Sequence, residues 1–164
     1  MIVLRSNTFF AARYSQLRSR LDSPKGDFAL QIVLPNPGNL ELMTLMSAKF
    51  TDFNTPQKLA ASIADVVNLW LKGSIYDKLK VERRSRLKVL FIDKYPLYSA
   101  YLFDGKEFWY IPYHFRNDHR DIPTFVFRDD FQSTEIYQDF DQLLSEAKPH
   151  DLSQALVLPA NLRA

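Results

Sequence analysis

The stretch from residue 86 to residue 111 constrains the fold more than any other part of the chain. It reads RLKVLFIDKYPLYSAYLFDGKEFWYI, three apolar or alternating runs separated by turn residues. The run 87–92 has the length and the branched or aromatic content of a buried strand. Residues 97–103 and 106–111 flank Asp104-Gly105, a dipeptide that accepts the positive φ angles of a tight hairpin turn. The sequence therefore predicts a strand followed by a β-hairpin.

The flanking segments alternate between strand patterns and helix patterns. Further strands are predicted over residues 1–5, 28–34 and 123–128, and helices over about 10–21, 39–50, 55–73 and 133–147. The order β-α-β-α-α-β-β-β-β-α predicts an α/β fold in which a mixed β-sheet is covered by helices. Residues 1–152 are expected to form a single domain, followed by a loosely packed C-terminal tail over 153–164.

The hairpin carries the chain's resemblance to a protein family. Phospholipase D-like domains place a His-x-Lys-x4-Asp motif where a strand enters a hairpin, and Gly follows the Asp, as Gly105 follows Asp104 here. Counting back puts Leu97 at the position of the family's nucleophilic His and Ser99 at the position of its phosphate-binding Lys. The chain thus resembles a degenerate phospholipase D-like domain of the kind attached to bacterial regulators and sensors. The resemblance implies a phospholipase D-like α/β sandwich, a non-catalytic regulatory or sensor role, and a homodimer.

The candidate ligand-binding residues lie at the hairpin and in the polar loop that follows it. The loop reads YHFRNDHRD over residues 113–121. Histidine can act as nucleophile, acid or base, and arginine can hold a phosphate through two parallel hydrogen bonds. A nucleotide or another phosphate-bearing ligand is therefore expected here. Its expected contacts are Ser99, Asp104, Lys106, His114, Arg116, His119 and Arg120.

The same loop also fits an enzyme. A phosphodiesterase or nuclease could use His114 and His119 as nucleophile and base, with Asp104 or Asp121 orienting one of them. Arg116 or Arg120 would then stabilise the phosphate.

A third function follows from an uneven distribution of charge. Residues 72–88 carry seven basic side chains against two acidic ones, a local charge of +5 that could bind nucleic-acid phosphates. The candidate contacts are Arg83, Arg84, Arg86 and Lys88. Residues 129–151 carry the opposite excess, seven acidic residues against one lysine.

Composition and spacing argue against several other classes of site. The chain has no cysteine, and its two loop histidines lack a helical zinc-binding spacing, so no metal or cofactor is expected. No apolar run approaches the ~18 residues of a membrane span, and the start lacks the pattern of a secretion signal. A cytoplasmic protein without a membrane segment is therefore expected.

Overall fold

The computed structural model describes residues 6–49, 53–112 and 123–163. The α-helices are α1 (Ser6–Leu21), α2 (Leu40–Ser47), α3 (Pro56–Asp65) and α4 (Glu135–Glu146), and a π-helical stretch η1 (Val66–Ile75) continues α3. The strands are β1 (Leu30–Pro35), β2 (Leu87–Ile92), β3 (Tyr98–Phe103), β4 (Glu107–Pro112), β5 (Phe125–Phe127) and β6 (Lys148–His150). Short 3-10 turns are η2 (Tyr76–Lys78), η3 (Val81–Arg86), η5 (Phe131–Ser133) and η6 (Ala160–Leu162). None of the described helices combines the length and apolarity needed to cross a membrane.

Strands β1, β2 and β6 form a sheet whose two faces are both covered along most of β1 and β2, with Gln31 and Lys88 exposed near the strand starts. β1 and β2 run parallel, from Leu30 opposite Leu87 to Pro35 opposite Ile92, and β6 pairs antiparallel with the other edge of β2. Ile32 and Val33 are both fully buried although they point to opposite faces. A strand with two covered faces needs a continuous apolar run, which is why this part of the sequence does not alternate.

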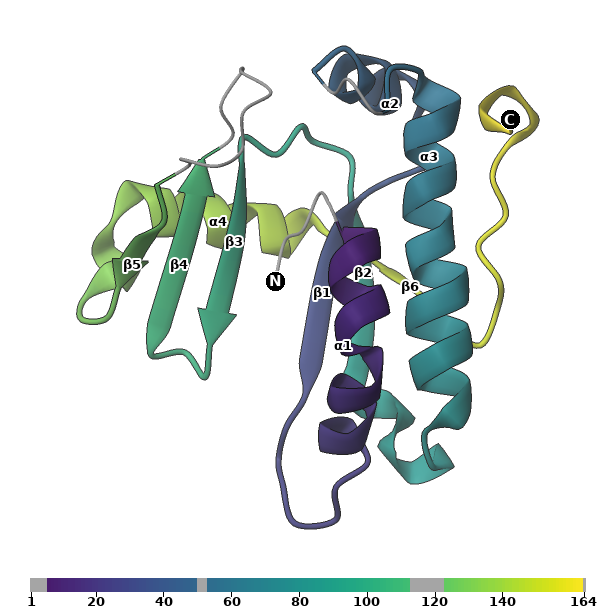
Figure 1. Cartoon of the computed structure of the whole chain (residues 1–164). Helices are drawn as coiled ribbons and strands as arrows, with labels where there is room; N and C mark the ends of the chain where they lie inside the picture. Colours follow the sequence, from purple (N-terminus) through teal and green to yellow (C-terminus); the bar gives the residue numbers. More distant parts are fainter. Residues whose placement is uncertain (1–5, 50–52, 113–122, 164) are drawn as a thin grey trace.

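One face of this sheet packs on α1 and on the long helix formed by α3 and η1 (Figure 1). The N-terminus of α3 is set by Thr55, whose hydroxyl accepts a hydrogen bond from the backbone N–H of Lys58, and by Pro56 at the first helical position. The face of α3 that meets the sheet carries Leu59, Ile63 and neighbouring apolar residues, which are buried in a first core.

Strands β3, β4 and β5 form a second, antiparallel sheet, and α4 covers one face of it (Figure 1). Phe108 lies at the centre of this second core, fully buried, with the Phe140 ring of α4 5.1 Å from its own. Thr134 begins α4 by accepting a hydrogen bond from the backbone N–H of Tyr137. Val33 and Ile92 belong to the same core, so it also covers the second face of the β1–β2–β6 sheet.

The α/β class is confirmed, and the arrangement of the sheet differs from the prediction. The described strands form two three-stranded sheets, whereas the sequence predicts a mixed sheet. The predicted strand over residues 1–5 lies outside the described residues. β6 was not predicted, because Lys-Pro-His is short, polar and contains a proline, features that belong to an edge strand and give no periodic signal.

The C-terminal segment packs more closely than the sequence predicts. Leu152 and Leu162 are buried in the first core, and Leu156 and Leu158 pack against it. Asn68 of η1 donates to the carbonyl oxygen of Leu156 at 2.9 Å and accepts from its N–H at 2.8 Å. The segment after β6 is therefore held along the outside of the α3–η1 helix.

Candidate functional site

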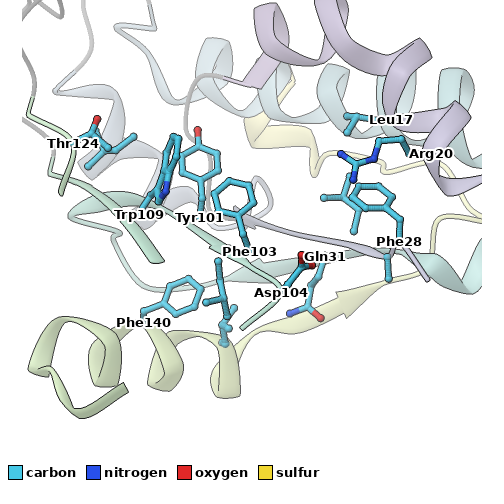
Figure 2. Close-up of a pocket in the computed structure, with 15 residues that line it drawn as sticks. Leu17, Arg20, Phe28, Gln31, Tyr101, Phe103, Asp104, Trp109, Thr124 and Phe140 are labelled. Carbon is cyan, nitrogen blue, oxygen red and sulfur yellow. The ribbon is translucent and has the colours of Figure 1, made fainter. Parts of the chain in front are cut away.

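A cleft of about 670 Å³ opens between α1 and β1 on one side and the β3–β4 hairpin on the other (Figure 2). We call it the inter-sheet cleft. Phe140 and Leu144 of α4 contribute to its lining. The other lining residues are Leu17, Arg20, Phe28, Ala29, Leu30, Gln31, Tyr101, Leu102, Phe103, Asp104, Trp109, Ile111 and Thr124. The cleft is mostly apolar and aromatic, with two charged side chains of opposite sign, Arg20 and Asp104.

Asp104 reaches the cleft from the tip of the hairpin. It has a φ of 52° and Gly105 a φ of 68°, the positive angles that the Asp-Gly pair predicts. The backbone N–H of Lys106 donates to the carbonyl oxygen of Phe103 at 2.9 Å and closes the turn. Asp and Asn tolerate the left-handed conformation better than other residues with a side chain, so Asp104 suits this turn and its backbone is fixed at the edge of the cleft.

The hairpin turn is one residue longer than a two-residue turn at Asp104-Gly105. Tyr98 lies opposite Pro112 and Phe103 opposite Glu107, so the pairing is shifted by one residue relative to a two-residue turn. Lys106 therefore belongs to the turn. The shift has a packing reason: it turns Phe108 and Tyr110 to the face of Tyr98 and Ala100, which α4 covers.

The same register places three aromatic side chains on the face of β3 and β4 that lines the cleft. We call Tyr101, Phe103 and Trp109 the aromatic wall. Tyr101 and Phe103 are two residues apart on β3 and stack nearly parallel, with ring centroids 6.3 Å apart and planes at 6°. Trp109 lies opposite Tyr101 on β4, and its ring meets Phe103 edge-on at 5.3 Å. Phe103 is 46% exposed, so this wall is open to a ligand. Burial raises the pKa of Tyr101, which keeps its phenol neutral.

The indole of Trp109 is held in a fixed orientation. Its Nε1–H donates to the carboxylate of Glu107, and that carboxylate also accepts from Nε of Arg128 at 2.9 Å. The hydrogen bonds from Arg128 and Trp109 lower the pKa of Glu107, so it stays an acceptor for the indole. The wall is thus organised before any ligand arrives.

Arg20 stands on the opposite side of the cleft, on the last turn of α1. Its guanidinium carbon lies 4.3 Å from the centre of the Phe28 ring. Stacking uses the flat face of the guanidinium and leaves its N–H groups free at the edges. No ion pair joins Arg20 or Asp104 to another residue in the described part of the chain. Arg20 was not among the predicted site residues, because only the tertiary fold brings α1 in front of the hairpin.

The positions equivalent to the family's His and Lys do not join Asp104. Ser99 lies five residues away along β3, about 17 Å for an extended strand, and does not line the inter-sheet cleft. Leu97 is 63% exposed and lines a separate hollow of about 210 Å³. Lys106 is exposed in the turn. Of the hairpin candidates, Asp104 is the one that the structure places in the large cleft.

The loop candidates lie outside the described residues. They are His114, Arg116, His119, Arg120 and Asp121. Pro112, the last described residue before them, pairs with Tyr98, at the end of the hairpin opposite to Asp104. A shared cleft of Ser99, Asp104 and His114 therefore has no support from the described part of the hairpin, and the role of the histidines stays a prediction.

The basic segment is largely engaged in structural contacts. Arg86 donates from Nη1 to the carbonyl oxygens of Leu21 and Ser23 at 3.2 and 3.0 Å, at the C-terminus of α1. Its neighbours Arg83 and Arg84 are half-buried: Arg83 lies 3.6 Å from the carboxylate of Asp22, and Arg84 stacks over the ring of Tyr76 at 5.2 Å. Lys88 is exposed on β2. Of the four residues predicted to contact nucleic acid, three thus have protein partners.

A second polar cluster lies at the carboxyl ends of β1 and β2. Asp93 accepts hydrogen bonds from Asn36 at 2.7 Å, from Asn39 at 3.3 Å and from Lys148 at 2.8 Å. These bonds, that from Lys148 first, lower the pKa of Asp93. Asn39 also begins α2 by accepting from the N–H of Leu42. Both carboxylate oxygens of Asp93 already accept hydrogen bonds from the protein, so the cluster has little capacity to bind a ligand. Its role is to connect the ends of the two strands.

Within the described ranges, no three side chains of the metal-binding types gather closely enough to hold an ion. Comparison with known proteins adds no assignment, since no family model, curated protein or solved structure matches the chain.

Proposed function

We propose that the chain is a non-catalytic regulatory or sensor module that binds a nucleotide or a similar phosphate-bearing aromatic ligand in the inter-sheet cleft. The observation that carries the proposal is the pair Arg20 and Asp104, which stand on opposite sides of an aromatic cleft without an ion-pair partner among the described residues. Both side chains are exposed, so their charges remain available to a ligand in the cleft.

The cleft has the size and chemistry of a small-molecule site. Its volume of about 670 Å³ falls in the range of pockets that enclose such ligands, which are mostly apolar with a few polar groups. The wall of Tyr101, Phe103 and Trp109 offers faces on which a base can stack. Arg20 offers guanidinium N–H donors to a phosphate, and its stacking on Phe28 limits the entropy that binding would cost.

The lining residues do not supply a reaction. Among the described residues of the cleft there is one carboxylate, no histidine, lysine or serine lines it, and the hydroxyls of Tyr101 and Thr124 have no histidine or lysine beside them in the cleft to act as a base. The family's nucleophile position holds Leu97, whose side chain lines a different hollow. Binding without turnover is therefore the function that this cleft supports.

The test is calorimetric titration of the full chain with guanosine, adenosine and uridine monophosphates, with inorganic phosphate and free tryptophan as comparison ligands. We expect at least one nucleotide to bind, more tightly than phosphate or tryptophan, and to be recovered unchanged. Arg20→Gln should weaken it about tenfold or more, because charged hydrogen bonds contribute roughly 1.5–3 kcal/mol each. Arg13→Gln is the control, since Arg13 lies on the same helix and bonds Gln16 instead.

Three results would overturn the proposal. The first is no nucleotide binding up to about 1 mM, which corresponds to about 4 kcal/mol. The second is an equal effect of the Arg13 and Arg20 substitutions. The third is hydrolysis of the bound nucleotide that Arg20→Gln abolishes, which would make the cleft an active site.

A further inference from the structure

We infer that the base bound in the inter-sheet cleft is guanine, and that Asp104 selects it. This inference rests on the proposed function and deepens it. Asp104 is the acidic side chain among the described lining residues, and it stands across the cleft from the arginine that would hold the phosphate. Base and phosphate lie at opposite ends of a nucleotide, so a nucleotide anchored at Arg20 turns its base toward the hairpin.

A carboxylate discriminates among bases because it only accepts hydrogen bonds. Guanine presents two adjacent donors, N1–H and the 2-amino group, spaced to meet the two oxygens of one carboxylate. Adenine and cytosine each pair an amino donor with a ring nitrogen that accepts, and uracil places its single N–H between two carbonyl oxygens. In each of these other bases, an acceptor atom of the base would lie beside a carboxylate oxygen of Asp104, which has no proton to donate. These bases therefore form one hydrogen bond fewer than guanine, and their acceptor is repelled by the carboxylate.

The hairpin turn places Asp104 at the edge of the cleft, beside the aromatic wall. The turn residues Asp104 and Gly105 both have positive φ, and the backbone bond from Lys106 to Phe103 closes the turn. Phe103, directly before Asp104, belongs to the aromatic wall. A base stacked on that wall therefore lies next to the carboxylate, and stacking and hydrogen bonding act on the same ring.

Asp104→Asn tests the inference without endangering the turn. Asn has the same shape and also adopts positive φ readily. Its amide offers one acceptor and one donor, which fits the N1–H and the 2-carbonyl of xanthine and no longer fits the two donors of guanine. Asp130→Asn is the matched control, because Asp130 also has a positive φ, 49°, and lies outside the cleft.

The experiment titrates wild type and both variants with guanosine, inosine, adenosine and xanthosine monophosphates. Wild type should bind the guanosine nucleotide about 10- to 100-fold more tightly than the adenosine nucleotide. Inosine monophosphate, which lacks only the 2-amino group, should bind with intermediate affinity. Asp104→Asn should lose most of the preference for guanosine over inosine and should bind xanthosine monophosphate more tightly than wild type does. Asp130→Asn should behave as wild type.

Failure of this inference differs from failure of the proposed function. If nucleotides bind and depend on Arg20, but guanosine and adenosine nucleotides bind equally well, the selection by Asp104 is wrong and the cleft remains a nucleotide site. The same conclusion follows if Asp104→Asn keeps the guanosine preference of wild type. If no nucleotide binds, both the inference and the proposed function fall.

Discussion

Replacing Asn68 by Ala should release the C-terminal segment from the helix that carries it. The Asn68 side chain donates to the carbonyl oxygen of Leu156 at 2.9 Å and accepts from the N–H of the same residue at 2.8 Å. It thus mimics a β-bridge between a helix and an extended chain. Leu152 and Leu162, on either side of this bridge, are buried in the first core.

The expected loss follows from the two hydrogen bonds. Each contributes a net ~1 kcal/mol in a partly buried setting, so Asn68→Ala should lower the free energy of unfolding by about 2 kcal/mol. In a chain of this size that corresponds to a drop of about 4–8 °C in the midpoint of thermal unfolding. Asn68→Asp keeps an acceptor for the N–H of Leu156 and removes the donor, and should cost at least half as much.

Urea unfolding measures the loss of stability, and limited proteolysis measures the release of the C-terminal segment. The urea midpoint should fall in Asn68→Ala, and chymotrypsin should cut the segment after Leu152 faster than in wild type. Gln57→Ala is the control, because Gln57 makes one exposed bond of 3.2 Å to the carbonyl oxygen of Asn161 in the same segment. An Asn68 variant as stable and as protease-resistant as the Gln57 variant would refute the argument that this bridge holds the segment.

Three further predictions concern the basic segment, the half-buried His150 and the assembly. Arg86→Lys keeps the charge and loses the fork that reaches two carbonyl oxygens of the α1 terminus, so the urea midpoint should fall by the equivalent of about 1 kcal/mol, while Lys88→Gln should leave it nearly unchanged. Burial lowers the pKa of His150 below its ordinary 6.5, so the folded chain binds fewer protons than the unfolded chain below that pH. Stability measured by urea unfolding should therefore fall as the pH is lowered through 6.5, and His150→Phe should reduce that slope. The homodimer that the resemblance implies predicts twice the monomer mass by light scattering, and a monomer over a wide concentration range would contradict it.

Local patterns in the sequence predicted the hairpin and most helices because these elements are decided by nearby residues. The Asp-Gly pair specifies a turn, and the apolar stripe of residues 55–73 specifies a helix. The register of β3 on β4 depends on which face α4 covers, which the turn dipeptide alone does not specify. That information lies in Phe131 and Phe140, far from the hairpin in sequence.

The candidate site was only partly predictable for the same reason. Asp104 was predicted as a site residue because the Asp-Gly turn matches the end of the motif on which the family resemblance rests. Arg20 was missed because nothing in the helix around it distinguishes it from Arg13 or Arg18, and its importance comes from facing the hairpin across the cleft. The third strand of the β1–β2–β6 sheet was missed as well, because β6 is too short to give a signal of its own.

Two acidic residues at the edges of the sheets, Asp93 and Asp104, should separate stability from binding. Asp93 accepts from three side chains, one of them Lys148, so its hydrogen bonds are completed by the protein itself. Asp93→Ala should therefore lower the free energy of unfolding, by on the order of 1 kcal/mol because the cluster is partly exposed to solvent. It should leave nucleotide affinity unchanged. Asp104→Asn should do the reverse, because the carboxylate has no ion-pair partner among the described residues and the turn accepts Asn. Urea unfolding and calorimetric titration of both variants provide the comparison. If Asp104→Asn destabilises the chain as much as Asp93→Ala does, then the Asp104 carboxylate stabilises the fold. The proposal that Asp104 is kept to bind a ligand in the inter-sheet cleft would then be refuted.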